Sequence, residues 1–265
     1  MKKRSGEKTM VHNLIFYDVD MYIQIVKLFK NNGIYTVRVD DIGDNLRLTG
    51  FNNNKTILTQ IYIDEYYYNF IGEGFMYLNL DFTIINENIL KYINDYNTCT
   101  DNLFIIKEKK NQDNKVYNEY FFGNSIDQVT YNTSPIAQDM KKYIDGKVNK
   151  SLNKGKCKIK INTDKLKNVF DILYYLDGVY FNVSGDILGI NTEDFSFNLT
   201  CNNKSDKKGK NIYKPNEVYN CLEYLPSDRV TFRFDEKSPL FIKSKYKRMT
   251  IEHTISPLHV VGKEV

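Results

Sequence analysis

The chain has 265 residues, of which 42% are hydrophobic and 14% aromatic. This composition supplies enough apolar side chains for a sizeable core and excludes general disorder. The sequence has no apolar run of about 18 residues, which a membrane-spanning helix requires. No apolar segment follows the basic start of the chain, so we expect no secretory signal.

The net charge of +4 is distributed unevenly. Residues 134–160 carry 8 Lys and 2 Asp, which fits either a polyanion partner or a solvated linker. Cys99, Cys157, Cys201 and Cys221 are widely spaced. We therefore predict neither a disulfide framework nor a zinc site, and we expect a reducing compartment.

The N-terminal half is predicted to begin with an amphipathic helix. Asp18 is a suitable N-cap, and Val19, Tyr22, Val26 and Phe29 share one apolar face. The opposite, polar stripe consists of Asp20, Gln24, Lys27 and Asn31. Strand-like runs follow at 34–39, 45–49, 56–63, 75–80, 102–107 and 116–122, and a second helix is predicted at 86–96.

The second half is predicted to repeat the first. Thr163 is a candidate N-cap for a helix that ends at Leu173, and a shift of 145 residues places Ile25 on Phe170. We expect an α+β fold with domains at 1–132 and 156–265, joined by a polar, Lys-rich linker at 133–155. Each domain would be an antiparallel sheet with two helices, and the helices would cover one face of the sheet with their polar sides outward.

Catalytic signatures are absent from the sequence. It contains no phosphate-binding glycine loop, no zinc-protease motif and no nucleophile elbow, and its three histidines have no obvious Ser or Cys partner. Asp40, Asp41 and Asp44 could hold a cation, but they lie in a turn where Asp is expected for backbone reasons. We predict a binding or scaffolding protein that is not an enzyme and has no metal and no cofactor.

Several segments resemble a known family, the sliding clamps of the proliferating cell nuclear antigen type. The segments that carry the resemblance are 40–48, 88–92, 101–106, 221–225, 228–242 and 255–258. The likeness is divergent and extends over about residues 14 to 260. The bias of the composition toward Lys, Asn, Ile and Tyr suggests a viral or protist member. The resemblance implies the DNA-clamp fold and a homotrimer that closes as a pseudo-sixfold ring around double-stranded DNA.

The resemblance also implies the contacts of such a ring. Ring closure would pair edge strands of neighbouring chains, and our candidates are Val116–Phe122, with Val116, Tyr117, Tyr120 and Phe122, and Phe195–Cys201, with Phe195, Phe197 and Leu199. Of the lysines, Lys27 and Lys91 match the family's DNA-lining positions best, and Lys30, Lys167 and Lys214 lie on or near the same helical faces. Asn88, Asn168, Asp171 and Glu223 stand where related clamps tend to carry Lys or Arg, so we expect weak, salt-sensitive contact.

The family further implies a partner groove under the linker. There a DNA polymerase and other replication or repair proteins would dock PIP-box-like peptides. Its wall would be Thr49, Phe51, Ile57, Pro239, Ser256 and Pro257, and its lid would be Ile136, Met140, Tyr143 and Ile144. The basic linker favours peptides with acidic flanks. A clamp loader is implied as a further partner, with no membrane contact, in the nucleus or at a cytoplasmic replication site if the protein is viral.

Other classes of protein remain open. A checkpoint-type clamp subunit or an open, monomeric or dimeric processivity factor would share the fold, and the open factor would need another basic patch, such as residues 141–160. A β-rich viral structural protein would suit the composition, although polar-faced helices at repeating places argue against it. A phosphoryl-transfer enzyme would need clustered carboxylates, which we could not assemble.

Overall fold

A computed structural model describes residues 12–80, 103–110, 113, 115–123, 128–148, 154–202, 207–208, 211–235 and 238–258. The first half contains β1 (Asn13–Phe16), α1 (Val19–Asn31), β2 (Thr36–Asp41), β3 (Asn45–Phe51), β4 (Ile57–Asp64), η1 (Glu65–Tyr67), β5 (Tyr68–Ile71), β6 (Phe75–Asn79), β7 (Leu103–Lys110), β8 (Val116–Gly123) and β9 (Gln128–Asn132). Helix α3 (Gln138–Asp145) comes next. The second half contains β10 (Cys157–Asn162), α4 (Thr163–Leu173), β11 (Tyr180–Ser184), β12 (Ile187–Asn191), β13 (Ser196–Thr200), β14 (Lys207–Lys208), α5 (Pro215–Glu223), β15 (Arg229–Phe234), β16 (Leu240–Tyr246) and β17 (Met249–Ile255).

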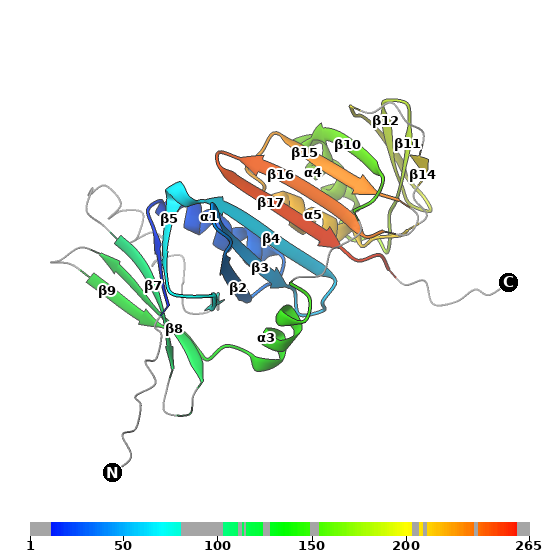
Figure 1. Cartoon of the computed structure of the whole chain (residues 1–265). Helices are drawn as coiled ribbons and strands as arrows, with labels where there is room; N and C mark the ends of the chain where they lie inside the picture. The colour runs from blue at the N-terminus through cyan, green and yellow to red at the C-terminus, as the bar shows by residue number, and fades with distance from the viewer. Residues whose placement is uncertain are drawn as a thin grey trace, which may run out of the picture.

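A sheet of 8 strands joins the two halves, in the order β10-β15-β16-β17-β4-β3-β2-β6. Its seam is the antiparallel pairing of β17 with β4, from Met249 opposite Ile63 to Ile255 opposite Ile57. A 5-stranded sheet, β5-β1-β7-β8-β9, and a 4-stranded sheet, β13-β12-β11-β14, complete the fold. Figure 1 shows these smaller sheets at opposite ends of the molecule, with α1, α4 and α5 behind the joining sheet.

The helices cover one face of the joining sheet because each buries an apolar stripe. Val26 and Phe29 of α1 are buried in the same core as Leu166 and Phe170 of α4. At Gly50 of β3 the packing leaves no room for a side chain, because an added Cβ would lie 2.4 Å from Cγ2 of Ile34. Among the described helices, none has both the length and the apolar composition that a membrane crossing needs.

The helix caps follow from short polar side chains. Asp18 accepts a hydrogen bond from the backbone N–H of Met21 at 2.9 Å, as predicted for α1. For α4 the cap is Asn162, which accepts from the N–H of Lys165 at 2.9 Å. The prediction of Thr163 as N-cap is therefore wrong by one residue. Thr163 is the first helical residue, and its hydroxyl donates to the carbonyl oxygen of Ser227 at 2.5 Å.

The segment predicted as a linker, residues 133–155, contains a helix. Residues 138–145 form α3, because Met140, Tyr143 and Ile144 fall on one face at helical spacing and pack against apolar side chains of the sheet. The second helix predicted at 86–96 lies outside the described residues. The division at 132 and 156 stays a prediction.

The prediction that Val116–Phe122 is an edge strand is wrong. This segment is β8, which pairs with β7 on one side and with β9 on the other. Within the described residues the edge of that sheet is β9, a strand that the sequence analysis did not identify. The second candidate, Phe195–Cys201, contains β13, which does lie at the edge of its sheet.

Candidate DNA interface and partner surface

We call the outward-facing surface of α1, α4 and α5 the helix face. It extends across the boundary between the two halves, since α1 belongs to the first half and α4 and α5 to the second. Nδ2 of Asn31 in α1 donates to the backbone oxygen of Asn220 in α5 at 2.7 Å, and the side chain of Gln24 donates to the backbone oxygen of Tyr224. The thiol of Cys221 contacts Oδ1 of Asn32 at 3.2 Å. These contacts fix α1 beside α5, so the outward sides of helices from both halves form one surface.

Four of the five lysines predicted to contact DNA are among the described residues, and they lie on or beside this surface. Lys27 and Lys30 are exposed on α1, and Lys214 is exposed immediately before α5. Lys167 is half-buried on α4. Lys91 lies outside the described residues.

Acidic side chains offset these cations. Asp20 of α1 and Asp164 and Asp171 of α4 are exposed, and Glu223 of α5 is half-buried. Lys165 of α4 is exposed as well, so basic and acidic groups nearly balance on the described helix face. Any phosphate contact there would be diffuse and easily screened by salt.

The predicted groove residues separate into two groups. Phe51, Ile136, Met140 and Tyr143 meet in one apolar cluster, which we call the linker cluster and which also contains Leu58, Tyr77, Val116 and Ile144. The rings of Phe51 and Tyr143 meet edge to face, 4.9 Å between centroids. In this structure the linker helix therefore covers Phe51, of whose surface 8% is exposed.

The second group lies at the end of the seam. Ser256 donates its backbone N–H to Thr56 O at 2.8 Å, which fixes the start of the Ser256–Pro257 segment beside β4. Pro239 immediately precedes Leu240, the partner of Ile255 in the sheet. These residues lie beyond the strand ends and are not members of the linker cluster.

Two residues are assigned to a different place by the structure. Ile57 belongs to the core beneath the helices, and its neighbour Leu58 faces the linker cluster. The wall assignment of Ile57 is therefore wrong by one residue, and the alternation of side chains along β4 inverts the face at each step. Thr49 is fully buried, and its hydroxyl finds no hydrogen-bond partner within the described residues.

The residues predicted for the subunit interface are also dispersed. Val116 is buried in the linker cluster, and Tyr120 is buried in the main core, where its hydroxyl donates to Asn79 O at 3.2 Å. Tyr117 is half-buried on β8, the strand that also carries Phe122. On the other candidate, Phe195 is half exposed, while Phe197 and Leu199 pack partly against the core.

An ion-pair network, missed in the sequence analysis, ties the linker helix to the sheet. Arg38 contacts Asp40 at 2.7 Å and Asp145 of α3 at 2.6 Å, and Arg47 contacts Asp40 at 3.3 Å. The hydroxyl of Tyr77 also donates to Asp145. Burial, reinforced by that hydrogen bond, raises the pKa of Tyr77 well above its ordinary value.

This network also accounts for the negative charge of Asp40, which arginine side chains neutralise without a bound metal cation. Both of its oxygens face guanidinium groups, and its side chain is only 9% exposed. Across the described part of the chain, no group of three His, Cys, Asp or Glu side chains is placed to hold a metal ion.

Comparison with known proteins identifies the architecture. No family model and no curated protein matches the sequence. Among solved structures, the model matches a crystal structure of proliferating cellular nuclear antigen from Entamoeba histolytica, with a TM-score of 0.68 over 93% of this chain and 98% of that chain. The chain has the sliding-clamp fold. The two sequences are 13% identical, so the likeness concerns the fold alone.

The clamp fold confirms the predicted α+β class. The match extends over almost the full length of both chains. The viral or protist origin that the composition suggested stays a prediction.

Proposed function

We propose that the chain is a DNA polymerase processivity factor that closes as a three-chain ring around duplex DNA. The observation that carries this proposal is the clamp fold over 93% of the chain, with α1, α4 and α5 together on one face of the joining sheet. A ring needs two different edges that are complementary, because a head-to-tail contact closes only if each chain offers one of each. Strands β9 and β13 are edges of the two terminal sheets, within the described residues, and are our candidates for that joint.

The helix face would line the hole and hold DNA loosely. Lys27, Lys30, Lys167 and Lys214, with Lys91, would attract phosphates without reading bases, which permits sliding. The acidic neighbours on α4 keep that attraction weak. In this role the chain would tether a polymerase to DNA and would not itself catalyse a reaction. A clamp loader would be a further partner.

Partner peptides would dock beside the linker. Exposed Ser256 and half-buried Pro257 and Pro239 offer an apolar and backbone surface at the end of the seam. Reaching Phe51 would require the linker helix to move, since Tyr143 packs on that ring. The basic linker favours peptides with acidic flanks.

Loading order on immobilised linear duplex tests the ring. With one DNA end fixed to a bead, the protein is added either before or after a bulky group blocks the free end, and the beads are then washed in high salt. A ring that threads onto DNA gives salt-resistant retention only when it is added before the block. Retention that is independent of the order, or absent in both, would contradict encirclement.

A further inference from the structure

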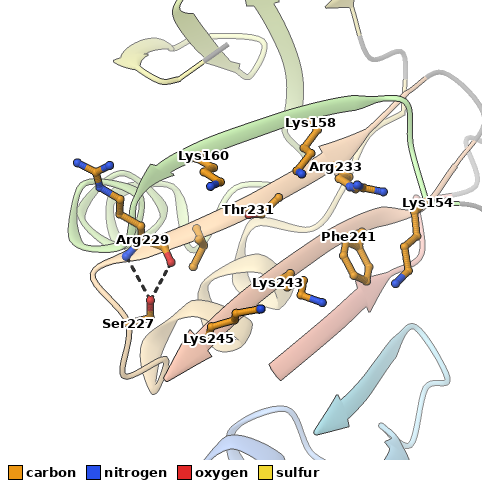
Figure 2. Close-up of a pocket in the computed structure, with 11 residues that line it drawn as sticks. Lys154, Lys158, Lys160, Ser227, Arg229, Thr231, Arg233, Phe241, Lys243 and Lys245 are labelled. Atoms are coloured by element: carbon orange, nitrogen blue, oxygen red, sulfur yellow. Dashed lines mark hydrogen bonds between the residues drawn. The ribbon is translucent and has the colours of Figure 1, made fainter. Parts of the chain in front are cut away.

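The face of the joining sheet opposite the helices carries a dense group of cations. We call it the outer basic face and define it by Lys158, Lys160, Arg229, Arg233, Lys243 and Lys245. These side chains come from β10, β15 and β16 and line a shallow hollow of about 580 Å³. Figure 2 shows them spread over the three neighbouring strands.

Strand alternation places these cations on one side of the sheet. In β10, Cys157, Ile159 and Ile161 are buried in the core, so Lys158 and Lys160 must point away from the helices. The same alternation in β15 buries Val230 and Phe232 between Arg229 and Arg233. The basic character of the face is therefore a consequence of the sequence pattern.

One pair of these cations stands directly opposite each other across neighbouring strands, and two more are separated by a single residue. Lys158 is paired in register with Arg233, and Thr231 lies between Lys160 on one side and Lys243 on the other. Like charges on directly opposed residues destabilise a sheet. A bound polyanion would remove that repulsion.

Local acidic groups neutralise only part of the charge. Glu252 of β17 contacts Lys243 at 2.7 Å and Lys154 at 3.2 Å. No ion pair involves Lys158, Lys160, Arg229, Arg233 or Lys245 within the described part of the chain. This face consequently retains a net positive charge, unlike the helix face.

The chemistry of the surface indicates what it binds. Its one aromatic ring, Phe241, is 4% exposed and lies beneath the ammonium of Lys154, 4.3 Å from the ring centroid. Protein partners are usually anchored by exposed aromatic or apolar groups, and single strands by exposed rings on which bases stack. The hollow instead offers ammonium and guanidinium groups with the hydroxyl of Thr231, which suit phosphate oxygens.

We infer that the outer basic face binds the phosphate backbone of duplex DNA, independently of sequence, as a site separate from the helix face. This inference does not rest on the proposed ring, since a surface contact needs no encirclement. Each phosphate neutralised contributes about 0.9 to the slope of log affinity against log salt concentration. Five cations without a described ion pair therefore predict a slope of about −4.5.

Binding to a closed dumbbell duplex tests the inference, because DNA with hairpins at both ends cannot thread through a ring. The test variant is K158Q/K160Q/K245Q, and the control K55Q/K110Q/K115Q removes the same charge from exposed lysines that lie outside the outer basic face and the helix face. Fluorescence anisotropy is measured over a series of salt concentrations, with circular dichroism melting to show that all three proteins are folded. We expect the test variant to lose at least tenfold in affinity and to flatten the salt slope by about two to three, whereas the control binds as the wild type does.

Three outcomes would overturn the inference. Equal affinity of wild type and test variant would show that the outer basic face does not bind DNA. Equal losses of affinity in the test and control variants would show that binding depends only on the net charge of the protein. Tighter binding of a single strand or of polyglutamate of the same charge would assign the face to another partner. Failure of the ring-loading experiment would leave this result untouched, because the dumbbell is bound from outside.

Discussion

Acidification is expected to destabilise the protein through His253, which lies at the seam between the two halves. His253 is fully buried, and its Nδ1 lies 2.9 Å from Oγ1 of Thr59 on the paired strand. Its Nε2 has no hydrogen-bond partner within the described residues. Burial disfavours the charged imidazolium and lowers the pKa of His253 from 6.5 to about 3.

The sign and size of the effect follow from proton linkage. Between pH 6.5 and about 3 the unfolded chain binds a proton at this residue and the native chain does not, so stability falls as the pH falls through that window. Above pH 6.5 both states are neutral here, and the contribution of His253 is constant. At about 1.4 kcal/mol per pH unit, the loss at pH 5 relative to pH 8 is about 2 kcal/mol.

The assay is urea unfolding of the wild type and His253→Gln at several pH values from 5 to 8. Thr59→Val is the matched control, because it perturbs the same contact but keeps the imidazole. We expect His253→Gln to lose about 2 kcal/mol less than the wild type between pH 8 and pH 5, and Thr59→Val to retain the wild-type slope. Equal slopes in the wild type and His253→Gln would refute the reasoning, whatever their absolute stabilities.

Three substitutions test the packing that positions the candidate surfaces. Gly155→Ala should lower the free energy of unfolding by about 1–3 kcal/mol, since its Cβ would lie 2.3 to 2.7 Å from the backbone of Phe234, whereas Gly146→Ala meets only ordinary contacts and should not. Thr49→Val removes a buried hydroxyl without a described partner and should leave stability unchanged or raise it by about 1 kcal/mol; a loss in denaturant unfolding would argue against that placement. Ile144→Ala, at a fully buried position, should weaken docking of the linker helix by about 2–4 kcal/mol, seen as faster amide exchange in α3; unchanged protection would contradict the packing described.

Local features of the fold were predictable from the sequence. The Asp18 cap and the apolar stripe of α1 depend on residues within a few positions of each other, and the predicted helix to Leu173 matches the end of α4. The helix at residues 138–145 was not recognised because its sequence is polar and rich in Lys. Its stability depends on tertiary contacts with Phe51 and Arg38, about 100 residues away in the chain.

The site was less predictable because it depends on strand order. Nothing local in Val116–Phe122 indicates that β9 covers its free edge, and the seam between β17 and β4 joins residues about 190 positions apart. The predicted groove wall included Ile57, but Leu58 is the residue of β4 whose side chain faces the linker cluster, because neighbouring side chains of a strand point to opposite faces. Lys158 and Lys160 alternate with buried residues in the sequence itself, but Arg233 and Lys243 join them only through the sheet register.

The solution mass, measured by light scattering at micromolar concentration in low and high salt, tests the ring most directly. Asn132→Lys with Asn198→Lys places like charges on β9 and β13, where they would oppose pairing. Asn53→Lys with Asn54→Lys adds the same charge in an exposed turn. We expect the wild type and the turn variant to have the mass of three 31.2 kDa chains and the edge variant to have the mass of one. A wild-type mass of one chain, or a three-chain mass that the edge variant retains, would contradict the ring proposed here.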